Sequence, residues 1–187
     1  MEDTLAATAR ASQDYAADVD HAATLAMRAM FQPRAVAVIG ASNEMEYGGR
    51  ALNNLVRAGF AGPIYPVNPK HDTIQGMKAY RDVRDIPGPV DLAVQVVPAR
   101  AMNGVIAACG EKGIPAGAVI SAGYAEQGPE GVLRQQELVR AARAAGMRLS
   151  GPNSIGVANL GARMCAAGGN VEWDAMPLMP GSISIVS

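Results

Sequence analysis

The sequence predicts an α/β fold: a doubly wound parallel sheet with helices on both faces, preceded by an N-terminal helical extension. Apolar runs alternate with amphipathic helical stretches about every 25 residues, which is typical of βαβ units. The apolar run from Ala35 to Ile39 is continuous, as expected for a strand that is buried on both faces. A length of 187 residues is enough for one well-packed domain with an appendage, or for two small domains.

The first predicted element is a helix over residues 3–30, which are rich in alanine and contain neither proline nor glycine. Its large apolar residues are sparse and irregularly spaced. We therefore expect this helix to lean on its own domain or on a partner subunit rather than to form part of the core. Pro33 ends it.

The first predicted strand is the apolar run from Ala35 to Ile39, which is bounded by Pro33 and Gly40. A helix over 50–58 is expected to place Leu52, Leu55 and Val56 on one side, with Gly59 as its C-cap. The remaining elements, bounded mostly by Pro or Gly, are strands at 63–67, 91–97 and 116–120 and helices at 100–112 and 129–145. This order indicates a Rossmann-like sheet.

The pattern changes after residue 150. Residues 151–181 show no periodicity, whereas 182–186 alternate like the first strand of another sheet. Because a strand needs neighbours, we expect the natural polypeptide to continue. The predicted organisation is a helical extension (1–29), a Rossmann-like domain (30–150) and a connector with the first strand of a truncated domain (151–187).

Composition excludes several classes of function. The net charge of −1 gives no electrostatic reason to expect nucleic acid or an anionic membrane as partner. Cys109 and Cys165 lie far apart without a CxxC motif, a pattern that fits neither zinc nor a disulfide scaffold. No apolar run approaches the ~20 residues that span a bilayer, and the acidic N-terminus does not resemble a signal peptide. These features predict a cytoplasmic protein.

The loop after the first strand predicts phosphate binding. Gly40, Ala41, Ser42 and Asn43 lie between a buried strand and a helix, where glycine permits a tight turn and the helix start favours anions. The spacing is not GxGxxG, so the dinucleotide fingerprint itself is absent. The alternative is a loop that merely turns the chain.

The end of the second strand bears on which nucleotide binds. Dinucleotide-binding folds for NAD place an acidic residue there, but this chain reads Asn68-Pro69-Lys70-His71 before Asp72. Lys70 would attract a phosphorylated ribose such as that of coenzyme A (CoA). It could equally be a solvated lysine. The flanking prolines predict a stiff loop.

Two more loops follow predicted strands at the same sheet edge, where ligands bind in open α/β sheets. They contain Val97-Pro98 and Ser121-Ala122-Gly123, whose small size suits a thin ligand such as pantetheine. Glu126 is either a ligand contact or a charge near a helix N-terminus. Neither His21 nor His71 belongs to a recognisable catalytic arrangement.

Taken in order, these motifs resemble the CoA-binding domain of NDP-forming (ADP-forming) acyl-CoA synthetases, relatives of the succinyl-CoA synthetase α subunit. The resemblance covers about residues 24–187. Its motifs are FQPRAVAVIGAS (31–42), NL (54–55), GF (59–60), Gly62, YPVNPK (65–70), PVDLA (89–93), SAGYAE (121–126), GPNSIG (151–156) and GSISIVS (181–187).

The resemblance implies a modular acid–thiol ligase. In this family ATP phosphorylates a histidine, the phosphate passes to a carboxylic acid, and CoA displaces it from the acyl phosphate. The ligase histidine and the ATP-grasp domain, with ATP and Mg²⁺, are expected outside this chain, which alone should bind CoA but be inactive. Ser154 departs from the cysteine of many relatives, and the first 20 or so residues match nothing in the family.

Strand-end position and resemblance together give the candidate CoA-binding residues: Gly40, Ala41, Ser42, Asn43, Asn68, Pro69, Lys70, Val97, Pro98, Ser121, Ala122, Gly123 and Glu126. No catalytic or metal-binding residue is predicted. The expected partners are CoA and the ligase and ATP-grasp parts of the same enzyme, with homo-oligomerisation left open. The alternatives are a non-catalytic CoA-binding regulatory module, for example of a protein acetyltransferase, and an NAD-binding oxidoreductase domain.

Overall fold

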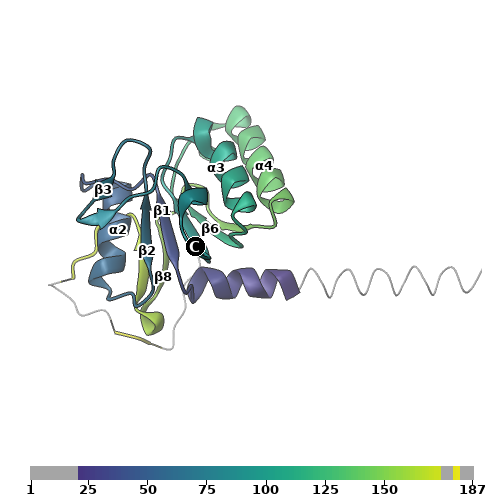
Figure 1. Ribbon diagram of the computed structural model, residues 1–187. Helices are drawn as coiled ribbons and strands as arrows, with labels where there is room; N and C mark the ends of the chain where they lie inside the picture. Colours follow the sequence, from purple (N-terminus) through teal and green to yellow (C-terminus); the bar gives the residue numbers. More distant parts are fainter. Residues whose placement is uncertain (1–20, 174–178, 182–187) are drawn as a thin grey trace, which may run out of the picture.

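A computed structural model describes residues 21–173 and 179–181 of the chain (Figure 1). The first part of the predicted helix 3–30 and the predicted strand 182–186 therefore lie outside the described residues. Among the helices of the described part, none is long and apolar enough to cross a membrane.

The centre of the fold is a parallel sheet of five strands in the order β2-β1-β5-β6-β7. This arrangement confirms the predicted α/β class. The strands are β1 (Val36–Ile39), β2 (Ile64–Val67), β5 (Leu92–Gln95), β6 (Ala116–Val119) and β7 (Arg148–Ser150). All residues of β1, β5 and β6 are buried, Gln95 of β5 among them, as expected for parallel strands that are covered on both faces.

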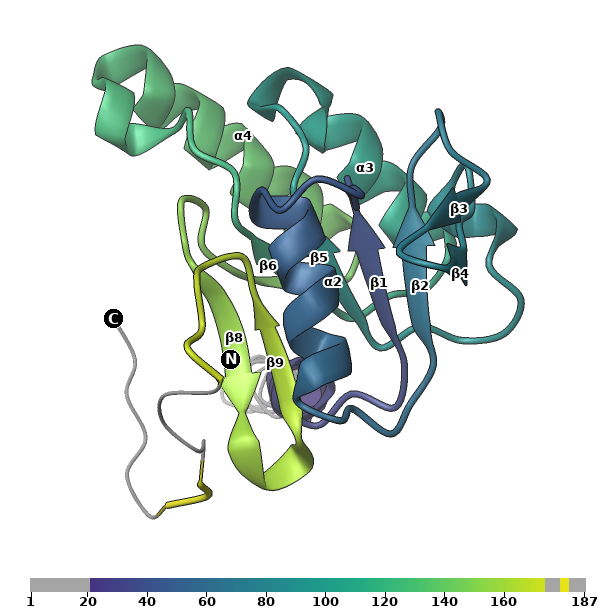
Figure 2. The ribbon, with the colours of Figure 1, turned by 90° about the vertical axis from the view of Figure 1, so that its left-hand side faces the viewer.

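Both faces of the sheet are covered. Helix α2 (Tyr47–Arg57) lies on one face, and α3 (Ala99–Glu111) and α4 (Pro129–Ala144) lie on the other (Figure 2). Side chains of β1 alternate between the two cores: Val36 and Val38 face the α2 side, whereas Ala37 and Ile39 face the α3 and α4 side.

An antiparallel hairpin of β8 (Gly156–Asn159) and β9 (Met164–Ala167) lies beside α2 (Figure 2), where β9 packs against α2 and β8 contacts β6. The described part of the N-terminal helix, 21–31, lies below the sheet, and its Ala29 and Met30 join the α2-side core. The expectation that this helix stays out of the core is therefore wrong for its last turn.

Several details differ from the sequence prediction. Helix α2 begins at Tyr47 rather than at residue 50, and Val56 is 49% exposed although Leu52 and Leu55 are fully buried. The strands β7, β8 and β9 were not expected. The connection from β2 to β5, for which no element is predicted from the sequence, carries a small hairpin, β3 (Thr73–Ile74) with β4 (Met77–Lys78), and a 3₁₀ turn, η1 (Val83–Asp85).

The strand order creates a switch point at β1. The chain moves from β1 to one side through α2 and β2, and then returns across β1 to β5 on the other side. The loops that follow β1 and β5 therefore diverge at the carboxyl edge of the sheet. In open α/β folds this divergence leaves a crevice for ligands.

Candidate nucleotide-binding site

The turn after β1 is built around Gly40. Its φ of +87° is unfavourable for other residues, and an added Cβ would lie 2.1 Å from the carbonyl oxygen of Val96. The Gly40 amide donates to Val67 O at 2.9 Å, and the Val96 amide donates to Ile39 O at 2.8 Å. Gly40 therefore lets the ends of β1, β2 and β5 meet at one point.

The first turn of α2 approaches this loop too closely for side chains. A Cβ on Gly48 would lie 2.1 Å from Gly40 O, and one on Gly49 would lie 1.9 Å from Glu44 O. This close approach explains why α2 begins within a pair of glycines that disfavour helix on their own. The start of α2 faces the turn, as the phosphate-loop prediction requires.

Two side chains from neighbouring loops hold the turn in place. Asn68 donates from Nδ2 to Ala41 O at 2.8 Å, and its Oδ1 accepts from the Lys70 amide at 2.9 Å. Gln75, in the turn between β3 and β4, donates from Nε2 to Ser42 O at 3.1 Å and to Gly49 O at 2.9 Å. The side chain of Asn68 is thus engaged in shaping the site.

The end of β2 presents a cation and no free acid to this edge. Pro69 and Lys70 are exposed, and within the described residues the Lys70 ammonium has no carboxylate partner. The first acid after β2, Asp72, is exposed and lies 3.4 Å from Arg81. Its backbone oxygen accepts from the Ala79 amide, which ties it to the small hairpin.

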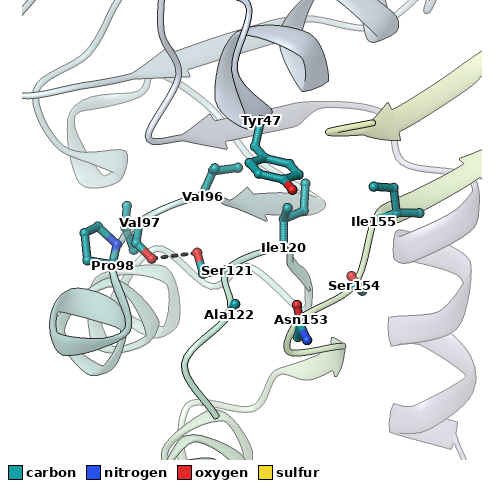
Figure 3. Close-up of a pocket in the computed structure, with 10 residues that line it drawn as sticks. All are labelled: Tyr47, Val96, Val97, Pro98, Ile120, Ser121, Ala122, Asn153, Ser154 and Ile155. Atoms are coloured by element: carbon teal, nitrogen blue, oxygen red, sulfur yellow. Dashed lines mark hydrogen bonds between the residues drawn. The ribbon is translucent and has the colours of Figure 1, made fainter. Parts of the chain in front are cut away.

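A pocket of about 550 Å³ opens at the carboxyl edge, between the start of α2 and the loops after β5, β6 and β7 (Figure 3). Four predicted residues line it: Val97, Pro98, Ser121 and Ala122. Sequence reasoning did not select six others that line it, which are Tyr47, Val96, Ile120, Asn153, Ser154 and Ile155. Predicted residues outside this lining are Gly40, Ala41, Ser42, Asn43, Asn68, Pro69, Lys70, Gly123 and Glu126.

Hydrogen bonds fix the floor of the pocket. Ser121 Oγ donates to Val97 O at 2.6 Å, as the dashed line in Figure 3 shows. The Asn153 amide donates to Ser121 O at 3.0 Å, and Ser154 Oγ donates to Val119 O at 3.2 Å. Three consecutive strand ends are therefore tied together by contacts that do not need a ligand.

Glu126 binds its own loop. Its carboxylate accepts hydrogen bonds from the amides of Gly123 and Tyr124, and these bonds hold the pKa of Glu126 below its ordinary value, with the nearby positive charge of Arg134 acting in the same direction. Arg134 in turn donates to Gly123 O. The sequence left open a ligand contact and a charge near a helix N-terminus; the structure shows a third arrangement, in which the carboxylate binds amides of its own loop.

The cysteines take no part in this edge. Cys109 and Cys165 are buried and unbridged, and burial raises the pKa of Cys109 to about 12. Burial also raises the pKa of Cys165. Among the described residues, no group of three or more His, Cys, Asp or Glu side chains could hold a metal ion.

A switch-point crevice with a glycine turn, a helix start and a partly apolar pocket defines the class: a Rossmann-like nucleotide-binding domain. The family follows from comparison with known proteins. Residues 34–159 match the family model described as "CoA binding domain", and the chain belongs to this family.

Curated relatives of the chain support the same family assignment. The chain is 43% identical over 136 residues to the α subunit of ADP-forming acetate–CoA ligase II of Pyrococcus furiosus, covering 73% of this chain and 30% of that protein. It is 39% identical over 168 residues to the α subunit of isoenzyme I of the same organism, covering 87% and 35%. This chain therefore spans about a third of these relatives and corresponds to their CoA-binding part.

A solved structure shows the same fold. The dinucleotide-forming acetyl-coenzyme A synthetase 1 of Ca. Korarchaeum cryptofilum, in complex with phosphate and ADP, superposes with a TM-score of 0.74 at 41% identity. The superposition covers 77% of this chain and 31% of that one.

Proposed function

We propose that this chain binds coenzyme A at the carboxyl edge of its sheet, as the CoA-binding part of an ADP-forming acyl-CoA synthetase. The observation that carries the proposal is the pocket of about 550 Å³ at the carboxyl edge of the sheet, with Tyr47 at the start of α2 on one side and Ser121 and Ala122 on the other. Membership in the CoA-binding domain family supports this assignment.

The chemistry of the edge matches the parts of CoA. The glycine turn and the start of α2 offer backbone N–H groups and a positive dipole end to a diphosphate. Lys70 offers a cation to the 3′-phosphate or the diphosphate. The pocket walls of Tyr47, Val97, Ile120 and Ile155 suit the thin, largely apolar pantetheine arm.

In the whole enzyme that we propose, an acid, CoA and ATP give acyl-CoA, ADP and phosphate by way of a phosphohistidine and an acyl phosphate. The role of this chain is to hold CoA so that its thiol can displace phosphate from the acyl phosphate. The histidine, the ATP-grasp fold and Mg²⁺ belong to other domains or subunits in this proposal. Within this chain, we propose that Gly40 to Asn43 and Lys70 bind the phosphates of CoA. Val97, Pro98 and Ser121 to Gly123 are proposed to bind its pantetheine arm.

Calorimetric titration of the chain with CoA and with NAD tests the proposal. We expect CoA to bind at least about tenfold more tightly, because one charge contact supplies about 1.4 kcal/mol. We also expect no acyl-CoA when the chain alone receives ATP, CoA and acetate. Equal or tighter binding of NAD, or acyl-CoA formation by the chain alone, would contradict the assignment.

A further inference from the structure

Asn54 is a buried polar residue of α2 that is only 4% exposed and does not line the pocket. Its carboxamide is nevertheless fully engaged. Nδ2 donates to Ala167 O at 2.8 Å and to Gly169 O at 3.0 Å, and Oδ1 accepts from Trp173 Nε1 at 3.0 Å. All three bonds reach the segment 167–173, which begins at the end of β9.

The first residues of this segment pack against side chains that line the pocket. A Cβ on Gly168 would lie 3.1 Å from Tyr47 Cδ1 and 3.2 Å from Ile120 Cδ1, and the Gly168 amide donates to Ile155 O at 2.8 Å. A Cβ on Gly169 would lie 3.0 Å from Ile155 Cδ1. Tyr47, Ile120 and Ile155 all line the pocket (Figure 3). Gly168 and Gly169 are therefore packed so closely against the pocket wall that a methyl group at either would displace its neighbours by a few tenths of an ångström.

We propose that Asn54 is a positioning residue for the ligand pocket. By holding segment 167–173, it fixes the side chains of Tyr47, Ile120 and Ile155 against which the ligand packs. The inference rests on the proposed function, since the ligand is taken to be CoA.

The chemistry of the contact makes asparagine specific. Both Nδ2 hydrogens are used on carbonyl oxygens, and Oδ1 is used on an indole N–H. Aspartate has nearly the same shape but offers no donor, so its oxygens would face the carbonyls of Ala167 and Gly169. Asn54→Asp therefore releases the segment without removing side-chain volume.

The chain supplies its own reporter and control. Trp173 is the one tryptophan of the sequence, so its emission reports whether the segment is held. Asn53, the preceding residue of α2, is half-buried, and no side-chain hydrogen bond is found for it within the described residues. Asn53→Asp introduces the same chemical change one position away.

The experiment measures the Kd of CoA by calorimetry, Trp173 emission and far-ultraviolet circular dichroism at a temperature where each variant is folded. We expect Asn54→Asp to shift the emission to longer wavelength and to weaken CoA binding about tenfold, the effect of losing one well-placed contact. Asn53→Asp should leave both unchanged. Gly169→Ala, which presses directly on Ile155, should weaken CoA binding with little change in emission.

A folded Asn54→Asp chain with red-shifted emission and unchanged CoA affinity would overturn the role of Asn54 but leave the proposed function intact. If this variant does not fold, Trp173→Phe removes the indole N–H donor, and with it the emission reporter, while keeping a smaller aromatic ring beside Arg57. Unchanged CoA affinity in both Trp173→Phe and Gly169→Ala would then overturn it. A wild-type chain that binds no CoA would instead overturn the proposed function, and this inference with it.

Discussion

Ser121 Oγ donates a 2.6 Å hydrogen bond to the carbonyl oxygen of Val97, joining the loops that follow β6 and β5. The hydroxyl is thereby occupied within the protein. We expect Ser121, which lines the pocket, to act by holding two of the pocket walls together.

Replacement of Ser121 tests this role. We expect Ser121→Ala to lower the free energy of unfolding by about 1 kcal/mol, the usual net value of one hydrogen bond, and to weaken CoA binding by a similar amount. Ser150→Ala, at a half-buried serine of β7, is the control and should change neither quantity much. Urea unfolding and calorimetry measure the two effects. Loss of CoA affinity with no loss of stability would instead indicate that the hydroxyl contacts the ligand directly.

Gly40 is the position where the site tolerates substitution least. Gly40→Ala should lower the free energy of unfolding by about 2–4 kcal/mol and eliminate measurable CoA binding, because the backbone is left-handed and the new methyl meets Val96 O. Gly104→Ala is the matched control. It lies inside α3 with nothing within 4 Å of its Cβ position, so it should stabilise the chain by about 0.5–1 kcal/mol. A Gly40→Ala chain with wild-type stability would contradict the geometry described for the turn.

The sequence predicts the main sheet well because its central strands carry a strong signal. Val36–Ile39 is buried on both faces and reads as a continuous apolar run, and Leu92–Gln95 is equally buried, with Gln95 as its one polar residue. The strand β7 carries no such signal, since Arg148, Leu149 and Ser150 are each half-buried at the sheet edge. The two hairpins also lack a clear signal in the sequence. Strands β3 and β4 have only two residues each. Strands β8 and β9 form a hairpin that is held by packing on α2 rather than by β propensity.

The candidate site could be predicted only where residues immediately follow a strand. Val97, Pro98, Ser121 and Ala122 satisfy that rule and line the pocket. Tyr47 could not be selected from the sequence because the two glycines that follow it disfavour a helix, so α2 is not expected to begin there. Ser154 and Ile155 follow a strand that the pattern does not reveal, although the GPNSIG motif marks their position.

The ion pair between Arg34 and Asp91, which precede β1 and β5, predicts how the stability of the fold depends on pH. Asp91 accepts from the Arg34 amide at 2.7 Å and from Arg34 Nε and Nη2 at 2.9 Å, and these bonds hold the pKa of Asp91 below its ordinary value of 3.8. A lowered folded-state pKa stabilises the fold above the ordinary pKa, and this contribution is lost as pH falls through the folded-state value. Asp91→Asn should therefore be less stable than wild type at pH 7, and the difference should narrow below pH 3.8. Urea midpoints measured across this range check the sign; a difference that grows on acidification would refute it.

Lys70 tests which phosphate the second loop binds. Lys70→Ala should weaken CoA binding by about 1.5–3 kcal/mol, the range for hydrogen bonds to charged groups, with little effect on stability because the residue is exposed. The affinity for dephospho-CoA, which lacks the 3′-phosphate, distinguishes a contact with the 3′-phosphate from a contact with the diphosphate. If Lys70 binds the 3′-phosphate, the variant will scarcely distinguish the two ligands; if it binds the diphosphate, affinity for both will fall equally. Wild-type affinity for CoA in the variant at physiological salt would remove Lys70 from the site.

Amide chemical-shift mapping of the isotope-labelled chain tests whether CoA binds at the carboxyl edge of the sheet. On addition of CoA we expect the largest shifts in the Gly40 turn, in Asn68 and Lys70, and in the pocket loops at 96–97, 120–123 and 153–155. The outer groove of α4, lined by Gln135, Gln136, Val139 and Arg140, should show none. Shifts confined to the α4 groove, or none at the carboxyl edge at saturating CoA, would contradict the account.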